Sequence, residues 1–178
     1  MILTDQEILK NIEKKNIVIE PFDPNCLGCN SYDVHLGKTL AVYNDETLDA
    51  RKHNQISTFE IPPEGHVLEP SKFYLGVTHE YTESHQHVPF LEGKSSVGRL
   101  GIDIHATAGK GDIGFCNFWT LEISVKQPVR VYAGMPIGQL IFFQTHGDVL
   151  VPYSQKSPAK YMRRHNRPME SMMRKNQF

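Results

Sequence analysis

The sequence predicts a single, mainly β domain with one short N-terminal helix and a basic C-terminal tail. Its 178 residues are enough for one domain with a core of its own. Short runs rich in Val, Ile, Tyr, Phe and Thr alternate with Gly, Pro, Asn and Asp, which is typical of strands and turns. No internal repeat, low-complexity tract or linker divides the chain. Many short strands with few helices indicate a barrel, a sandwich or a jelly roll.

The helix is expected at the start of the chain. Thr4 is a suitable N-cap, and Glu7 follows three residues later, as in a capping box. Ile8, Leu9 and Ile12 form one apolar face of this helix.

The strands are expected from Ser31 onward. Alternation is clearest in residues 115–125, which place one apolar set and one mixed set on opposite faces. The apolar set, expected in the core, is Trp119, Leu121, Ile123 and Val125; the opposite set is Phe118, Thr120, Glu122 and Ser124. The other expected strands are Ser31–Leu36, Leu40–Tyr43, Lys72–Thr78, Gln86–Leu91, Ile102–Thr107, Val129–Tyr132, Ile137–Phe143 and Val149–Pro152.

Composition excludes several classes of function. The 19 basic and 20 acidic side chains nearly balance, which argues against nucleic acid as a partner. No run approaches the roughly 20 apolar residues that cross a bilayer. The first residues lack the pattern of a signal peptide, and three cysteines, an odd number, argue against a disulfide framework. We therefore expect a cytoplasmic protein without a membrane partner.

The C-terminal segment, residues 156–178, has seven Lys and Arg side chains against the single acid Glu170. It could be a solvated tail, or a lid that closes over a polyanion bound elsewhere, because terminal segments can order around ligands.

Two features could carry chemistry together. The loop Gly93–Gly101 offers Ser95, Ser96 and Arg99 as hydrogen-bond donors, which suits an anion, although it lacks the order of a P-loop and such turns are common. Glu122, on the outer face of its strand, could transfer protons or could simply face solvent.

The cysteines and histidines do not form a recognisable metal motif. Cys26 and Cys29 have the spacing of a zinc pair, but only Cys116 remains to complete a site, and the zinc deaminase motif is absent. His79, His85 and His87 allow at most a poorly patterned metal site. We therefore assign no metal site. We interpret His105, beside the turn at Thr107–Gly109, as an imidazole that shapes a site or, alternatively, as a base.

Several segments, taken together and in order, resemble the dCTP deaminase family of the trimeric dUTPase-like superfamily. The segments are Cys26–Gly28, Asn30–Gly37, Gly93–Gly101, His105–Gly109, Asp112–Phe115, Trp119–Glu122, Gly134–Leu140 and Lys160-Tyr161. The resemblance implies a distorted β-barrel of the dUTPase type. It also implies a homotrimer with active sites between subunits.

The resemblance implies hydrolytic deamination of dCTP to dUTP and ammonia, without zinc, on the route to dUMP. Glu122 matches the family's catalytic carboxylate, which moves a proton from water to the pyrimidine. Ser95 and Arg99 match residues at the phosphates and the catalytic water. Lys94, Ser96, Val97 and Gly98 complete that loop.

The remaining matches concern substrate binding. Asp112 matches the acid that contacts deoxyribose, and Thr120-Leu121 matches the segment whose backbone reads the base. The triphosphate would be held by Gln139, Tyr153 and Lys160, with Arg164 where the family usually has Gln. Magnesium would arrive with the triphosphate.

The sequence leaves open whether dUTP or dUMP is released, because one turn departs from the family's usual pattern. After Ala108 the chain has Gly109, where family members that only deaminate tend to carry His, and glycine is more typical of bifunctional members that release dUMP and pyrophosphate. Lys110-Gly111 and Ile113 depart from both patterns. We expect dUTP as the product, with the bifunctional reaction as the alternative. A plain dUTPase and a non-catalytic nucleotide sensor are further alternatives, and dUTP and the inhibitor dTTP are further nucleotides to consider.

Overall fold

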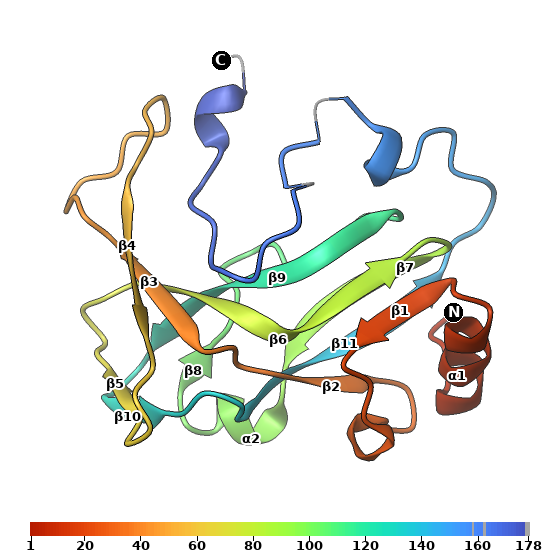
Figure 1. Ribbon diagram of the computed structural model, residues 1–178, viewed down its shortest axis with the longest axis horizontal. Coiled ribbons are helices and arrows are strands. Elements are labelled where there is room, and N and C mark those ends of the chain that lie inside the picture. Colours follow the sequence, from red (N-terminus) through yellow and green to blue (C-terminus); the bar gives the residue numbers. More distant parts are fainter. Residues whose placement is uncertain (158, 162, 177–178) are drawn as a thin grey trace.

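The computed structural model describes residues 1–157, 159–161 and 163–176 (Figure 1). Pro158, Met162, Gln177 and Phe178, which belong to the expected tail, lie outside the described residues. The expected fold class is confirmed, since strands dominate and a short helix, α1 (Asp5–Glu13), begins the chain. The other helical elements are η1 (Pro24–Cys26), α2 (Ser95–Gly98), η2 (Tyr153–Gln155) and η3 (Met173–Lys175). The strands are β1 (Ile17–Glu20), β2 (Tyr32–His35), β3 (Thr39–Tyr43), β4 (Ile56–Glu60), β5 (His66–Leu68), β6 (Tyr74–Ser84), β7 (His87–Gly93), β8 (Ile102–Asp103), β9 (Phe115–Val125), β10 (Val129–Val131) and β11 (Pro136–Gln144).

Helix α1 follows Thr4 as predicted, but the expected capping box does not form. The side chain of Thr4 makes no capping hydrogen bond, and Glu7 instead accepts a hydrogen bond from Lys10 Nζ at 2.6 Å. Ile8 is fully buried and Ile12 packs against the core, whereas Leu9 is exposed. The prediction that Leu9 belongs to the buried face was wrong because a single short helix buries only a narrow stripe.

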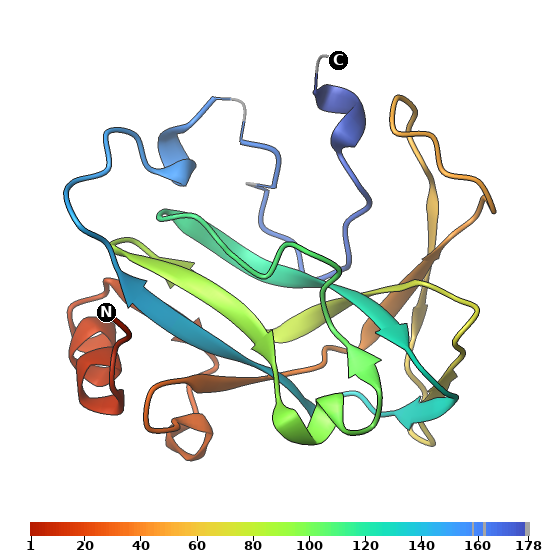
Figure 2. The same cartoon turned by 180° about the vertical axis from the view of Figure 1, so that it is seen from behind.

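The strands form three sheets. The largest has the order β4-β3-β6-β9-β8, with β1 pairing to one end of the long strand β6. The second has the order β2-β11-β7, and the third is the pair β10-β5. These sheets are not closed, so the strands wrap around the core as an open arrangement. Figures 1 and 2 show the two larger sheets facing each other, with α2 on one side of the molecule and the C-terminal segment on the other.

A break in the register of β6 places a polar group inside the sheet. Between Val77 and Tyr81 the pairing of β6 with β9 shifts. The hydroxyl of Thr78 accepts a hydrogen bond from the backbone N–H of Trp119 at 3.0 Å and donates to the carbonyl of Glu80 at 2.9 Å. A side chain thereby satisfies a ladder donor where the backbone carbonyl cannot, and the strand can bend over the core.

The alternation predicted for β9 is confirmed. Trp119, Leu121, Ile123 and Val125 are buried, and the residues between them are half-buried. The core that they join draws on all three sheets and includes Tyr32, Leu40, Leu68, Tyr74, Val131, Ile137 and Phe142. The fully buried side chain of Leu121 therefore stabilises the strand, while only its backbone remains to contact a ligand.

Other strand predictions were wrong in detail. Val149–Pro152 is irregular, and Leu150 is 99% exposed, so this apolar run has no strand partner among the described residues. The expected strand Ile102–Thr107 ends at Asp103. Strands β1, β4 and β5 were not predicted, because each has only three to five residues, too few to show a clear alternation, and β1 and β5 pair with segments distant in sequence.

No helix in the described part of the chain is long and apolar enough to cross a membrane.

Candidate active site

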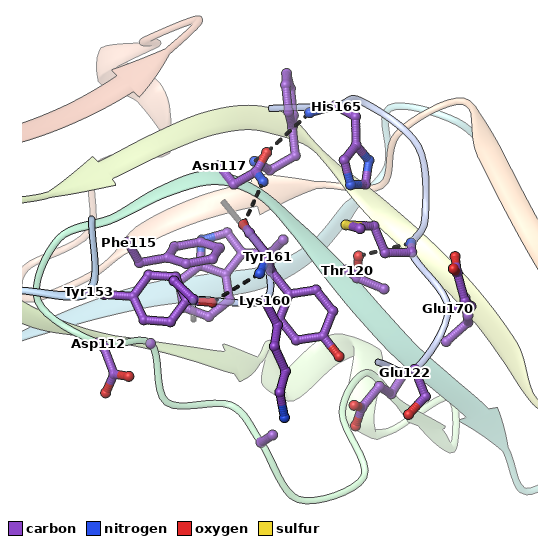
Figure 3. A pocket seen from close by; sticks show the side chains of 18 of the residues that line it. Asp112, Phe115, Asn117, Thr120, Glu122, Tyr153, Lys160, Tyr161, His165 and Glu170 are labelled. Carbon is purple, nitrogen blue, oxygen red and sulfur yellow. Dashed lines mark hydrogen bonds between the residues drawn. The ribbon is translucent and has the colours of Figure 1, made fainter. Parts of the chain in front are cut away.

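A cavity of about 710 Å³ lies between the outer face of β9 and the C-terminal segment (Figure 3). Strand β9 supplies its floor, the 108–112 turn supplies one wall, and residues from 153 onward cover it. The predicted site residues that line it are Ala108, Asp112, Thr120, Glu122, Tyr153 and Lys160. The sequence matches thus converge on one hollow although they come from three separate segments.

Glu122 is fixed in place by the segment that follows β8. Its Oε2 accepts a hydrogen bond from the backbone N–H of Ala106 at 2.8 Å, and its own N–H donates to the carbonyl of Ile104 at 2.9 Å. The side chain is half-buried at the cavity wall. A carboxylate held in this way can accept a proton from a bound water and return it to a second atom nearby.

The 108–112 turn is pressed against strand β7. The carbonyl of Gly109 accepts from the N–H of Leu91 at 2.7 Å, and the N–H of Gly111 donates to the carbonyl of Pro89 at 2.8 Å. A Cβ atom at Gly109 would lie 2.6 Å from the carbonyl oxygen of Leu91, and one at Gly111 would lie 2.7 Å from the ring of Trp119. Both positions therefore require glycine while the turn keeps this path.

The same turn carries Asp112 and contacts His105. Asp112 is exposed at the cavity edge and accepts a hydrogen bond from Lys110 Nζ at 2.6 Å. His105 lies against Gly109, with its Nε2 3.6 Å from a carboxylate oxygen of Glu92. Its buried Nδ1 has no hydrogen-bond partner among the described residues. His105 is outside the cavity lining.

Asn117 anchors the C-terminal segment to β9. Its Nδ2 donates to the carbonyls of Tyr161 (3.0 Å) and Arg163 (3.1 Å), and its Oδ1 accepts from the N–H of His165 at 3.3 Å. Asn117 is only 3% exposed. The sequence analysis missed this residue, although an amide on the otherwise apolar core face of this strand is a signal that could have revealed it.

Two further hydroxyls hold the same segment. Thr120 Oγ1 accepts from the N–H of Met169 at 3.3 Å, and the hydroxyl of Tyr43 accepts from the N–H of Ser171 at 3.1 Å. Burial raises the pKa of Tyr43, so its hydroxyl keeps its proton at neutral pH. The expected tail is therefore docked over β9 as far as residue 176, apart from the two undescribed positions within it.

Some basic residues of this segment line the cavity and others do not. Lys156 and Lys160 line the cavity, Lys160 Nζ contacts Asn176 Oδ1, and the hydroxyl of Tyr153 accepts from the N–H of Tyr161 at 3.1 Å. Arg164 is outside the lining: its guanidinium lies 3.9 Å from the ring centre of Tyr81.

The predicted anion loop lies elsewhere. None of residues 94–99 is in the cavity lining, and Figures 1 and 2 place α2 on the far side of the sheets from the C-terminal segment. Lys94 Nζ contacts Asp33 Oδ2, Val97 is buried, and Ser95, Ser96 and Arg99 are exposed. Gln139, on β11, is paired in register with Asp33 and Glu92 and so lies on this side of the molecule too.

A family model described as dCTP deaminase-like matches residues 2–145. The chain belongs to the dCTP deaminase family. This membership confirms the resemblance seen in the sequence, and the match spans β9 and the Gly93–Gly101 loop but ends before the segment that covers the cavity.

Known relatives are similar in sequence to this protein over most of its length. A Leptospira biflexa protein named "dCTP deaminase, dUMP-forming" is 50% identical over 149 residues, which cover 84% of this chain and 85% of the relative. A Cytophaga hutchinsonii protein of the same name is 48% identical over 170 residues, covering 96% of this chain and 94% of the relative. The crystal structure of 2′-deoxycytidine 5′-triphosphate deaminase from Agrobacterium tumefaciens superposes with a TM-score of 0.65 at 22% identity, over 82% of this chain and 48% of that one. The last comparison shows a shared fold.

Proposed function

We propose that this protein deaminates dCTP and also cleaves the triphosphate, releasing dUMP, pyrophosphate and ammonia. The observation that carries the deamination is Glu122, held by the Ala106 N–H at the wall of a nucleotide-sized cavity. The names of the relatives, which are dUMP-forming, favour this bifunctional reaction over the dUTP release that we expected from the sequence.

In the proposed deamination, the Glu122 carboxylate takes a proton from water, and the hydroxide adds to C4 of the cytosine ring. The carboxyl group delivers that proton to N3 of the pyrimidine. Glu122 then moves the proton of the new C4 hydroxyl to the amino group, which leaves as ammonia while the C4 carbonyl forms. One water is consumed and the carboxylate is restored, so the step needs no metal at the reacting carbon. The Ala106 N–H keeps one oxygen of Glu122 fixed while the proton moves.

The rest of the cavity would hold the nucleotide. The backbone of Thr120 and Leu121 lies beside Glu122 and would read the base edge, and Asp112 would accept a hydrogen bond from the deoxyribose. Tyr153 and Lys160 at the cavity rim would contact the triphosphate, with Lys156 adding positive charge.

The anion loop would come from another subunit. Lys94, Ser96, Val97 and Gly98 with the donors Ser95 and Arg99, together with Gln139, lie away from the cavity of their own chain. In a homotrimer, α2 of one subunit can face the β9 cavity of the next, and every site is then complete. This arrangement would bring Ser95 and Arg99 to the phosphates and the attacking water.

Magnesium would be brought by the substrate. Two lysines line the cavity, and Asp112 is already paired with Lys110, so the residues fit a cation carried on phosphates rather than one caged by the protein. Its contribution would be to neutralise phosphate charge.

The second reaction is supported by the Gly109 turn. A histidine, which is typical of members that only deaminate, cannot occupy position 109 here because its Cβ would overlap the Leu91 carbonyl. In the proposed second step, water attacks the α-phosphorus of dUTP and the bond from this phosphorus to the bridging oxygen of the β-phosphate breaks. The products are dUMP and pyrophosphate.

Product analysis tests this proposal. Incubation with dCTP should give ammonia, pyrophosphate and dUMP in equal amounts. Ammonia with dUTP would remove the second reaction, and pyrophosphate from dUTP without ammonia from dCTP would indicate a plain dUTPase. Binding of either nucleotide without turnover would indicate a sensor.

A further inference from the structure

Three potential metal ligands converge at the end of the β6–β9 strand pair, away from the residues assigned to deamination. Glu83, His85 and Cys116 each present one ligand atom, and these atoms lie within 4.8 Å of one another. Zinc bonds of about 2.0–2.3 Å place tetrahedral ligand atoms about 3.5 Å apart. The three ligand atoms would therefore have to move about 1 Å closer together to bind zinc.

The backbone already holds these ligands on one face. Glu83 and Cys116 are directly opposite in the antiparallel register, and His85 follows two residues after Glu83, in the tight turn to β7. The turn is fixed by hydrogen bonds from the N–H of His85 to the carbonyl of Asn16 (2.8 Å) and from the Ser84 hydroxyl to the carbonyl of His87 (2.7 Å). Zinc binding would therefore require these side chains to rotate but would not require the backbone to rearrange.

The chemical environment suits a cation of intermediate softness. Sulfur, imidazole nitrogen and carboxylate oxygen together form a typical zinc donor set. The Tyr81 hydroxyl donates to Glu83 Oε1 at 2.7 Å, and such outer hydrogen bonds orient metal-bound carboxylates.

The three side chains also contact one another and the neighbouring backbone. His85 Nε2 and Glu83 Oε2 are 2.7 Å apart, and the Cys116 thiol contacts the carbonyl of Gly114 at 3.4 Å. The side chains of His85 and Glu83 are 41% and 26% exposed, so an ion can reach them from solvent.

We propose that Glu83, His85 and Cys116 bind a zinc ion, with water as the fourth ligand. On binding, the thiol of Cys116 loses its proton to solvent and the thiolate takes the metal, while the hydrogen bond between His85 and Glu83 opens. Glu122 is six residues further along the same strand, or about 20 Å away, so this site is separate from the proposed deamination chemistry, which needs no zinc.

Cobalt spectroscopy on the full, untagged, metal-free chain tests the proposal, because Co²⁺ occupies zinc sites and reports thiolate ligands through a charge-transfer band. We expect one Co²⁺ per chain with this band, and full displacement of the band by one equivalent of Zn²⁺. Cys116→Ser should abolish the band, and His85→Ala, at a half-exposed position, should weaken zinc binding at least tenfold. Zinc should also raise the unfolding midpoint of the natural protein but not that of Cys116→Ser.

Two controls distinguish this site from others. Cys29→Ser removes an exposed cysteine elsewhere and should leave the band unchanged, and so should Glu122→Gln. The proposal is overturned if no thiolate band forms, if the band survives in Cys116→Ser, or if it disappears in Cys29→Ser. Thermal unfolding of the metal-free variants checks that each remains folded.

Discussion

The β9 cavity and the α2 loop differ in how completely each is built within one chain. In the cavity, Glu122 and the covering segment are fixed by hydrogen bonds from distant parts of the sequence, including those of Asn117 and the Ala106 N–H. At α2, Arg99 is exposed and its guanidinium donates only to the nearby Ser95 carbonyl, at 3.1 Å, among the hydrogen bonds of the described residues. The cavity is enclosed by residues of its own chain, whereas the hydrogen-bond donors of the α2 loop face solvent.

The two sets of residues do not meet within one chain, and under our proposal they are two halves of one nucleotide site. Residues that one resemblance assigns to one nucleotide lie on two sides of the molecule, and the covering segment closes only the half that contains Glu122. Turnover by the cavity without α2 of another subunit would contradict this proposal. Substitutions that affect only one of the two halves test it further.

Glu122→Gln should have the largest effect. The amide can still accept the Ala106 N–H, so the cavity should keep its shape while the proton shuttle is lost. Ammonia release from dCTP should fall by roughly 10²–10⁴-fold, with little change in nucleotide affinity. Glu60→Gln, at an exposed position of β4, is the matched control and should retain full activity. Normal turnover by Glu122→Gln would remove Glu122 from the mechanism.

Gly109→Ala should come next, because the new Cβ would lie 2.6 Å from the Leu91 carbonyl oxygen and must displace the turn. We expect a loss of stability of about 1–3 kcal/mol. Movement of the Ala106 N–H away from Glu122 should slow deamination by roughly 10–100-fold. Gly98→Ala, which meets no atom within 4 Å, should leave the unfolding midpoint almost unchanged. An equally small effect at both positions would show that the turn does not constrain the cavity.

Asn117→Ala should release the segment that covers the cavity. The carbonyls of Tyr161 and Arg163 lose their donor, at a cost of about 1–3 kcal/mol if they stay buried. We expect faster proteolysis after residue 156 and a higher KM for dCTP, with the core sheets intact by circular dichroism. Unchanged proteolysis would mean that other contacts hold the segment.

The fold class and the two faces of β9 could be predicted from the sequence because the alternation in 115–125 is local. The residues around Glu122 were found through a resemblance, since neither Asp112 nor Lys160 has a pattern that reveals its role. Asn117 was missed because its partners are backbone carbonyls more than 40 residues away, and no local pattern encodes them. The strand expected at Val149–Pro152 failed for the converse reason: its β propensity is local, but no neighbouring strand pairs with it in the described structure.

A smaller effect concerns pH and the sheet next to α2. Burial lowers the pKa of His87 below its ordinary value of 6.5, and in the part of the chain that the structure describes its buried Nδ1 has no hydrogen-bond partner. Below about pH 6.5 the unfolded chain therefore binds more protons, and stability should fall as the pH falls, by up to about 1.4 kcal/mol per pH unit. His87→Leu should flatten this dependence in chemical unfolding at pH 5 to 7. The exposed His146, changed to Gln, is the control, and an unchanged slope in His87→Leu would contradict the assignment.

Mixing two inactive variants tests most directly whether the two halves meet between subunits. Glu122→Gln and Arg99→Ala chains, each inactive alone, are unfolded together in equal amounts and refolded, and ammonia release from dCTP is measured. If Glu122 from one subunit works with Arg99 from the next, about a quarter of the sites in randomly mixed trimers contain both native groups. The account predicts recovery of about a quarter of the natural activity, and no recovery in a well-folded mixed trimer would contradict it.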